Sequence, residues 1–341
     1  MELSRLLVLG ALLVAIILPV LVSFISGGWV ARYYSPPYSV ADIPDLRGKT
    51  AIITGSNCGI GYVTARELAR KGAKVIVAAR SEERGMDAVA RIKKELGGEP
   101  TVEFLKLDLA SFAQIAQFVR SFRAKHSNLD ILVLNAAVIM NSYTETEDGF
   151  ESQIGVNHLG HFLLVKLLLP MIRYSKSRVV HVSSASHEQS YPEGIRFETF
   201  KGGKELYSRF FAYGQSKLAG VLFSNELAAR LNGTGATSNA LHPGIISTEG
   251  QRHVKGLMQS TIVTRAILFA IEMLWNAAVL STDDGALTTL FVATSPSMGT
   301  TTGRYYIPIA LDRTSATAVQ ARNVTLQKEL WTVSEKYISG W

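Results

Sequence analysis

The pattern of hydrophobic and polar positions alternates between two periods from residue 50 onward. Short apolar runs rich in β-branched residues predict buried strands, and longer amphipathic stretches between them predict helices. Strands are predicted over residues 50–53, 74–79, 102–107, 131–134, 178–182, 237–241 and 305–309. Helices are predicted over residues 62–71, 82–96, 111–125, 150–173, 213–231 and 258–280. Continuously apolar strands separated by helices are typical of a parallel sheet covered on both faces. We therefore expect one α/β domain with a doubly wound (Rossmann-type), mostly parallel, seven-stranded sheet.

The first 30 residues follow a different pattern. No charged residue occurs from Leu6 to Val30, a span of 25 positions (30 − 6 + 1). About 20 apolar residues cross a bilayer as a helix, whereas the apolar part of a cleaved signal peptide has ~7–15. The pattern predicts an N-terminal transmembrane helix in a membrane anchor over 1–31, a proline-containing linker over 32–47 and a folded domain over 48–341.

The charges that flank this segment predict its orientation. Arg5 precedes it, and Arg32, Arg47 and Lys49 follow it. The positive-inside rule then places the domain on the cytosolic side of a single-pass anchor.

Composition narrows the classes of partner. The formal net charge is +7, and the basic residues are scattered without a basic block, so we expect no nucleic acid and favour an anionic cofactor or membrane surface. Cys58 is the only cysteine, which excludes an intrachain disulfide framework and a cysteine-cluster metal site. His158 and His161 are three residues apart, but no carboxylate or cysteine completes a metal set, so no metal is expected and polar packing is favoured.

A glycine-rich turn follows the first predicted strand. A strand, a turn with backbone open to close approach and a helix N-terminus together form a site for a pyrophosphate, although such a cluster alone could be an ordinary tight turn. The spacing is Gly-x-x-x-Gly-x-Gly. The residues predicted to bind a cofactor here are Gly55, Ser56, Asn57, Gly59, Ile60 and Gly61.

Later strand ends carry further candidate cofactor residues. Arg80 ends the second strand, 19 residues past Gly61 (80 − 61), where an NAD-binding fold carries an acidic residue; its guanidinium favours the 2′-phosphate of NADP. Asp108, with Leu109 beside it, can accept a hydrogen bond from adenine or cap the next helix. Asn135 and Ala136 end the fourth strand, either near a ribose or as a plain tight strand end.

The candidate catalytic residues lie on two predicted helices and a strand end. Tyr213 and Lys217 are four residues apart and share a helix face, where an ammonium beside a phenol lowers the phenol pKa and gives a general acid/base. Ser184 ends the strand before them and can hydrogen-bond a reacting oxygen, or it can cap a turn. Asn157 lies on the inward stripe of the 150–173 helix, where a structural hydrogen bond is the alternative role.

In this order, these motifs resemble the short-chain dehydrogenase/reductase family. The resemblance covers residue 45 to the C-terminus, and Val156–Phe162, Val182–Ser184, His242–Gly244 and Gln320–Asn323 are similar to the membrane-anchored retinol dehydrogenase group. Polyprenol-acting and WW-domain-bearing relatives are also similar, although no WW domain is evident. Two departures are Ala137, where the family usually has glycine, and the long segment from Ser186 to Phe211, which is also long in the retinol group and shapes the substrate mouth.

The resemblance implies roles for individual residues. Tyr213 exchanges a proton, Lys217 lowers the Tyr213 pKa and binds the nicotinamide ribose, Ser184 orients the carbonyl, and Asn157 anchors a proton-relay water. Pro243 and Gly244 bind the cofactor, and Thr248, which follows them, holds the nicotinamide carboxamide.

The expected protein is thus an NADP-dependent oxidoreductase of the endoplasmic reticulum membrane that interconverts a lipophilic alcohol and its aldehyde or ketone, with a retinol-like substrate favoured. The predicted helix 258–280 lines a lipid mouth, touches the membrane, or covers the sheet as a core helix. A steroid or polyprenol dehydrogenase is the alternative enzyme, and a cofactor-binding scaffold with little turnover is the alternative from another class. The sequence is compatible with both a homodimer and a monomer.

Overall fold

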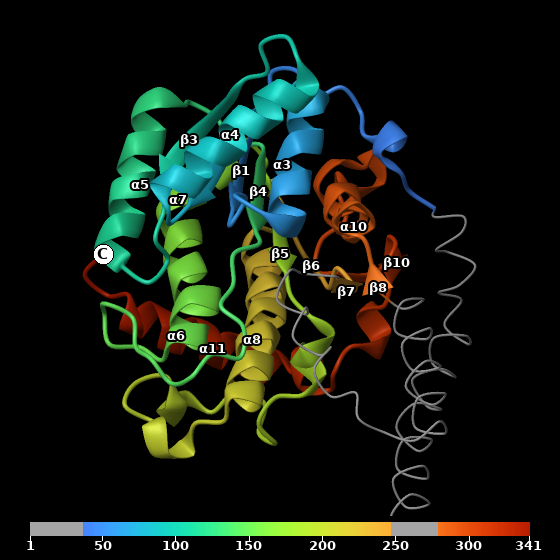
Figure 1. Cartoon of the computed structure of the whole chain (residues 1–341). Coiled ribbons are helices and arrows are strands. Elements are labelled where there is room, and N and C mark those ends of the chain that lie inside the picture. Colours follow the sequence, from blue (N-terminus) through green and yellow to red (C-terminus); the bar gives the residue numbers. More distant parts are fainter. Residues whose placement is uncertain (1–36, 247–278) are drawn as a thin grey trace, which may run out of the picture.

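The computed structural model describes residues 37–246 and 279–341, and a single sheet lies at their centre (Figure 1). The predicted membrane span, the predicted helix 258–280 up to residue 278, and Thr248 lie outside the described residues. The sheet has eight strands in the order β10-β9-β6-β5-β4-β1-β2-β3. Their bounds are β1 Thr50–Thr54, β2 Lys74–Ala79, β3 Val102–Lys106, β4 Ile131–Leu134, β5 Arg178–Val182, β6 Thr237–Leu241, β9 Tyr305–Ile307 and β10 Leu311–Asp312.

Each of the seven predicted strands is present, and those seven are parallel. The predicted count is wrong by one because β10 adds a two-residue antiparallel strand at the edge beside β9. A separate pair, β7 (Ile245–Ile246) and β8 (Val279–Leu280), forms a small parallel sheet. The last two residues of the predicted helix 258–280 therefore belong to a strand.

The helices agree with the periodicity except in three places. Their bounds are α3 Gly59–Arg70, α4 Glu82–Leu96, α5 Phe112–Lys125, α6 Ser152–Ile154, α7 His161–Tyr174, α8 Arg209–Arg230, α10 Thr282–Thr294 and α11 Val324–Tyr337. The predicted helix 150–173 is interrupted by a π-helical turn, η2 (Gly155–Gly160). Helices α10 and α11 were not predicted. Nine of the thirteen α10 residues are buried, so the helix has no polar face that would mark a period of 3.6.

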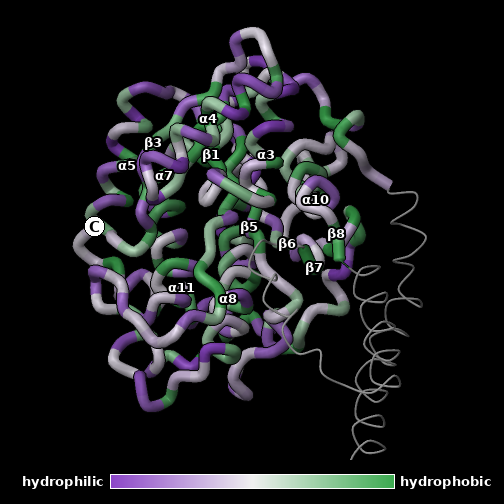
Figure 2. The backbone as a smooth tube through the Cα atoms, viewed as in Figure 1, coloured by the Kyte–Doolittle hydropathy of each residue, from purple (hydrophilic) through white to green (hydrophobic). Residues whose placement is uncertain are grey.

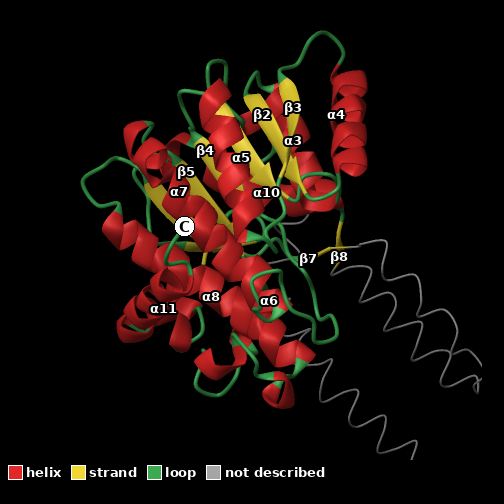
Figure 3. Ribbon diagram, turned by 90° about the vertical axis from the view of Figure 1, so that its left-hand side faces the viewer, coloured by secondary structure: helices red, strands yellow, loops and turns green. Residues whose placement is uncertain are grey.

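Two hydrophobic cores, one on each face of the sheet, hold the layers together (Figure 3). Helices α5, α7, α8 and α11 contribute to one core, and α3, α4 and α10 contribute to the other. Successive strand residues alternate between them, since Ile52 belongs to the first core and Ala51 and Ile53 to the second. Figure 2 shows the corresponding hydropathy pattern, with hydrophobic positions along the central strands and hydrophilic ones on the outer helices and loops. The doubly wound prediction is confirmed.

Residues 37–46, which the sequence assigns to a linker, lie against the domain. Tyr38, Ile43 and Leu46 are buried in the second core. The Tyr38 hydroxyl forms a 2.7 Å hydrogen bond with Thr294 of α10. These three apolar side chains therefore pack residues 37–46 against the domain, and Tyr38 finds its partners on α10.

One helical stretch among the described residues, Ser152–Tyr174, has the length and hydropathy of a membrane span. Two thirds of its most apolar window (67%) is buried inside the protein. Its side chains belong to the first core, so it is a core helix that covers the sheet.

The sheet reverses its winding direction between β1 and β4. From β1 the chain continues outward to β2 and β3, and from β4 it continues the other way to β5 and β6. In open α/β sheets, ligands bind at the carboxyl ends of the strands at this reversal.

Candidate active site

The glycine-rich turn leaves the carboxyl end of β1 and is closed by backbone contacts. Gly55 has a φ of +66°, and a Cβ on it would lie 2.8 Å from the Cα of Ala136. A Cβ on Gly61 would lie 2.5 Å from the side-chain nitrogen of Asn135. Both positions therefore require glycine. The Ser56 hydroxyl is buried and donates to the Ile53 carbonyl at 2.7 Å, so only its backbone is left for a ligand.

The N-terminus of α3 is open where an anion would approach. Its cap residue, Cys58, makes no side-chain capping hydrogen bond. A Cβ on Gly59 would meet no atom within 4 Å, and Gly59 has a φ of +58°. Asn57 and Ile60 flank this position. Free N–H groups and the helix dipole favour negative charge here, so the turn fits the pyrophosphate of a dinucleotide.

Arg80 lies at the same edge of the sheet. Thr54 pairs with Ala78 across the β1–β2 ladder, and Arg80 follows Ala78 by two residues, so it lies level with the glycine-rich turn. Its side chain is exposed. An exposed guanidinium beside this turn fits a phosphate group of the adenosine half.

Asp108 and Leu109 lie beyond β3, the next strand in this direction. Asp108 accepts a hydrogen bond from the Ala110 backbone N–H at 2.9 Å through one carboxylate oxygen, in a local turn. The N-cap residue of α5 is Ser111, so Asp108 does not have the capping role that the sequence offered as an alternative. Leu109 has its side chain in the first core, so only its backbone can reach a ligand. Its carbonyl lies close to Gly160, where a Cβ would approach to 2.5 Å.

Asn135 and Ala136 are held against β1 by Thr54. The Thr54 hydroxyl accepts from the backbone N–H of Asn135 at 2.9 Å and of Ala136 at 3.0 Å. The Asn135 side chain donates to the carbonyls of Thr54 at 2.9 Å and Gly55 at 3.2 Å. These bonds fix the end of β4 against the glycine-rich turn.

His161 extends this network to Asn157. Its Nδ1 lies 3.1 Å from the Asn157 carbonyl, and its Nε2 lies 2.9 Å from the Thr54 hydroxyl. A carbonyl can only accept, so Nδ1 carries the proton and Nε2 accepts from Thr54. Burial lowers the pKa of His161 to about 4, so the ring is neutral at physiological pH. The sequence treated His161 as polar packing, and here that packing joins the cofactor edge to Asn157.

Asn157 uses its whole carboxamide in structural bonds. Its side-chain oxygen accepts from the Val138 N–H at 2.8 Å, and its nitrogen donates to the Val138 carbonyl and to the Ser216 hydroxyl, both at 2.9 Å. The structural alternative from the sequence is thus confirmed for the side chain. Only the main-chain carbonyl of Asn157 is left to bind a water. The π-helical turn η2 creates this arrangement, and such turns are frequent at functional sites.

Ser184 leaves the end of β5 and opens a short 3₁₀ turn, η3 (Ala185–Glu188). Its hydroxyl accepts from the Ser186 N–H at 3.2 Å, so it also performs the turn-capping role. Gly214, next to Tyr213 on α8, allows η3 to approach, because a Cβ there would collide with the carbonyls of Gln189 and Ser186. The missing side chain at Gly214 brings Ser184 and Tyr213 together.

Tyr213 and Lys217 are both buried on α8, at 7% and 6% exposure. Burial raises the pKa of Tyr213 above its usual value, and a side-chain hydrogen bond with Ser184 acts in the opposite direction. The sequence predicted that Lys217 lowers the pKa of Tyr213, and the raised pKa corrects this prediction. The Lys217 Nζ lies 5.7 Å from the Tyr213 ring centroid and donates to the Val182 carbonyl at 3.0 Å. Burial lowers the pKa of Lys217 itself to about 8.

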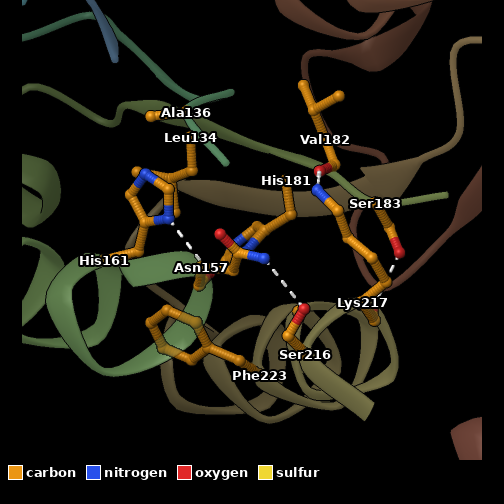
Figure 4. A pocket seen from close by; sticks show the side chains of 11 residues that line it. Leu134, Ala136, Asn157, His161, His181, Val182, Ser183, Ser216, Lys217 and Phe223 are labelled. Atoms are coloured by element: carbon orange, nitrogen blue, oxygen red, sulfur yellow. Dashed lines mark hydrogen bonds between the residues drawn. The ribbon is translucent and has the colours of Figure 1, made fainter. Parts of the chain in front are cut away.

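A polar cavity lies behind this pair (Figure 4). Its lining joins the π-helical turn, the end of β5 and α8, and consists of Leu134, Ala136, Asn157, His161, His181, Val182, Ser183, Ser216, Lys217, Gly220 and Phe223. The structure thus brings Asn157 of η2 and Lys217 of α8 together around one cavity. Ser184 directly follows the lining residue Ser183 in the chain, and Tyr213 lies three residues before the lining residue Ser216. Hydroxyl, imidazole and ammonium groups around one cavity suit an ordered water.

Pro243 and Gly244 follow β6 at the same edge. Gly244 has a φ of +99°, its N–H donates to His242 Nδ1 at 3.0 Å, and a Cβ there would lie 2.7 Å from a Leu280 side-chain carbon. Thr248, predicted to follow them toward the nicotinamide, lies outside the described residues.

Three residues that shape the site were not predicted. Ser216 and Gly214 have the roles given above, and Gln153 ties two loops together. Its side-chain oxygen accepts from the Met140 N–H at 2.8 Å, and its nitrogen donates to the Tyr207 hydroxyl at 2.8 Å. Gln153 lies four residues before Asn157, and Ser216 lies directly before Lys217, so a search for polar side chains around each candidate would have found them.

Comparison with known protein families agrees with this geometry. The family model described as short chain dehydrogenase matches residues 49–205. Human retinol dehydrogenase 12 is 40% identical over 290 residues, which cover 85% of this chain and 86% of that protein. Bovine retinol dehydrogenase 12 is 38% identical over 325 residues, which cover 94% of this chain and 96% of that protein. An uncharacterized oxidoreductase of Schizosaccharomyces pombe is 40% identical over 81% of each chain.

Solved structures share the fold. An uncharacterized protein from Mycobacterium paratuberculosis aligns with a TM-score of 0.67 and 32% identity, covering 88% of this chain and 97% of that one. L-sorbose reductase from Gluconobacter frateurii, solved with NADPH and L-sorbose, aligns with a TM-score of 0.61 and 21% identity, covering 79% and 97%.

Proposed function

The chain belongs to the short-chain dehydrogenase/reductase family and is an oxidoreductase, and on that premise we propose an NADP(H)-dependent enzyme that interconverts a lipophilic alcohol and its aldehyde or ketone. The observation that carries this proposal is that buried Tyr213 and Lys217 and half-buried Ser184 lie together at the sheet edge that also holds the glycine-rich turn. Bound NADPH would supply a hydride to the substrate carbon.

The residues of this chain would manage the proton and the substrate oxygen. Since burial raises the pKa of Tyr213, its phenol keeps its proton at neutral pH and can donate it to a carbonyl oxygen. The Ser184 hydroxyl, hydrogen-bonded to Tyr213, would hold the same oxygen. Lys217 would bind the nicotinamide ribose, and the Asn157 carbonyl would hold a water in the cavity through which the proton is replaced.

Arg80 is the reason for proposing that the enzyme prefers NADP to NAD. The position that would carry an acidic residue in an NAD-binding fold holds an exposed arginine instead. A carboxylate there would repel a 2′-phosphate, whereas a guanidinium donates to it.

Replacing Arg80 by alanine should weaken NADPH binding about 10- to 100-fold and leave NADH binding nearly unchanged, because a hydrogen bond to a charged group is worth roughly 1.5–3 kcal/mol. Dissociation constants for the two cofactors, measured by nicotinamide fluorescence, test this. Arg173→Ala is the matched control. Arg173 is also an exposed arginine, but it lies in the last turn of α7, away from the glycine-rich turn. Equal losses for both cofactors would remove Arg80 from phosphate recognition.

The substrate class rests on the relatives, several of which carry the name retinol dehydrogenase at 36–40% identity. We therefore favour a retinol/retinal-like substrate, with a steroid or polyprenol as the alternative. Turnover of retinoids, steroids and polyprenols by the detergent-solubilised full-length protein, each with NADPH and NADH, tests the assignment. Turnover of steroids or polyprenols alone would replace the retinoid by that class.

A scaffold without turnover is the rival from another class. It would need the fold and the glycine-rich turn but not Ser184, Tyr213 and Lys217. Binding of NADPH without turnover of any substrate in the same screen would favour it.

The apolar segment Leu6–Val30 supports a further part of the proposal, a single-pass anchor in the endoplasmic reticulum membrane with the domain in the cytosol. Assembly as a homodimer is compatible with this arrangement but is not needed by the site, since one chain supplies each proposed catalytic residue.

Two glycosylation acceptor sequences report on sidedness. Asn232-Gly233-Thr234 follows the end of α8 and Asn323-Val324-Thr325 opens α11, and both asparagines are exposed. For a cytosolic domain, the protein expressed in eukaryotic cells should show no mobility shift on glycosidase treatment and should stay with membranes in carbonate or high salt. A glycosidase-sensitive shift would place the domain in the lumen, and release by carbonate would remove the anchor.

A further inference from the structure

The segment Lys201–Phe211, which comprises the last part of the connection from β5 to α8 and the first three residues of α8, exposes large apolar side chains. Phe210 is 60% exposed, Leu206 48% and Phe211 46%. Single exposed apolar residues are ordinary, but three within six residues form a patch that usually marks an interaction site. The segment lies at the carboxyl edge of the sheet, between Ser184 and Tyr213.

The Tyr207 hydroxyl and two backbone carbonyls of this segment are hydrogen-bonded to neighbouring segments. The Tyr207 hydroxyl donates to the Asn141 carbonyl at 2.7 Å, and Gln153 donates to the Arg209 carbonyl at 3.1 Å. The Tyr191 hydroxyl donates to the Leu206 carbonyl at 3.2 Å. These bonds hold the backbone in place, so the apolar side chains are presented outward by a fixed loop.

The loop after β4 also presents an exposed apolar side chain, and the same buried residue, Gln153, holds this loop. Gln153 also accepts from the Met140 N–H, and Met140 adopts a φ of +47°. The residue before it, Ile139, is 61% exposed. The loop after β4 and the Lys201–Phe211 segment therefore share one buried glutamine and both present apolar side chains to solvent.

The segment is also basic. Lys201, Lys204 and Arg209 are exposed, and Glu205 is the one acidic residue, which gives a net charge of +2 (3 − 1). Within the described part of the chain, none of these three cations forms an ion pair with a carboxylate, although Lys201 lies 5.2 Å from the Phe150 ring centroid. Their charge is available to a partner.

This combination fits a lipid surface better than a protein. The cores of protein interfaces are depleted in lysine, whereas interfacial membrane contacts combine lysine and arginine with phenylalanine and leucine. Basic residues near an anionic bilayer are attracted to its surface, and the apolar side chains add their burial at the headgroup boundary.

We propose that Lys201–Phe211 rests on an anionic membrane surface, with Leu206, Phe210 and Phe211 at the headgroup boundary and the three cations against lipid phosphates or carboxylates. The contact turns the catalytic edge of the sheet toward the bilayer, so that a lipid substrate can pass to Tyr213 without crossing bulk water. The membrane contact does not depend on the proposed reaction, because it is a property of the surface.

The single cysteine allows a direct test with the full-length protein in vesicles of phosphatidylcholine and phosphatidylserine. In a Cys58→Ser background, Phe210→Cys or Leu206→Cys carries an environment-sensitive fluorophore, and the vesicles contain lipid with a shallow spin-label quencher. Tyr174→Cys is the control, since Tyr174 is 81% exposed at the opposite edge of the sheet. Two labelled positions guard against one variant failing to fold.

We expect several-fold stronger quenching at positions 210 and 206 than at 174, and a loss of that difference for Lys204→Glu/Arg209→Glu. Equal quenching at all three positions would overturn the proposal. So would a fluorescence change at 210 that follows protein density without lipid quenching, which would mean a second copy covers the segment. Turnover of a small water-soluble aldehyde by the same samples reports separately on the proposed reaction.

Discussion

Replacing Tyr213 by phenylalanine is expected to lower kcat by a factor of roughly 10²–10⁴ while NADPH still binds, because a positioned acid/base contributes about that much. Phenylalanine fills the same buried space, so the fold and the packing of α8 against η3 should persist. The loss comes from the phenolic proton, which burial keeps on Tyr213 by raising its pKa.

Steady-state kinetics of carbonyl reduction and a separate NADPH binding measurement check this result. Tyr337→Phe is a suitable control. Tyr337 lies on the far helix α11, and its ring packs against Phe150 and Phe200. A Tyr213→Phe enzyme with near-parental kcat would contradict the catalytic assignment and favour a scaffold.

Replacing Lys217 by methionine should abolish measurable turnover and yet raise the melting temperature of the cofactor-free protein at pH 7. Burial lowers the pKa of Lys217 from 10.5 to about 8, which corresponds to roughly 3 kcal/mol of destabilisation while the group is charged. Methionine removes the charge and keeps the packing. Loss of the hydrogen bond to Val182 returns about 1 kcal/mol of this gain.

The difference between the two proteins should depend on pH in a defined direction. Between pH 8 and about 10.5 the unfolded chain holds a proton that native Lys217 has lost, so the wild type gains stability as pH rises through this window. The advantage of Lys217→Met should therefore be largest below pH 8 and shrink toward pH 10.5. Differential scanning fluorimetry across this range measures it, and a variant that melts below the wild type at pH 7 would refute the buried charge.

The sequence was sufficient for most of the fold. The seven parallel strands were visible because each is a short apolar run between turns, and the glycine-rich turn marked where the winding begins. Strands β7, β8 and β10 have two residues each, too few to show any period. Helix α10 is buried over nine of its thirteen residues, and its packing against α3 and Tyr38 depends on residues more than 200 positions away.

The candidate site was predictable as a set of residues but not as a geometry. Tyr213 and Lys217 are four apart on α8, so the sequence could place them on one face. It could not show that η3 would approach α8 at Gly214, or that burial would raise the phenol pKa against the opposing effect of the hydrogen bond with Ser184. Likewise, Asn157 was correctly placed facing inward, but its bonds to Val138 and Ser216 depend on the π-helical turn and on contacts 19 and 59 residues apart.

Deuterium transfer tests the central claim most directly. The full-length protein is incubated with retinal and NADPH deuterated at both C4 positions of the nicotinamide, and the alcohol product is analysed by mass spectrometry. We predict one deuterium on the product carbon for the wild type and no labelled alcohol above background for Tyr213→Phe. Failure of the wild type to form labelled alcohol from retinal, or from any steroid or polyprenol carbonyl tested in its place, would contradict the proposed oxidoreductase.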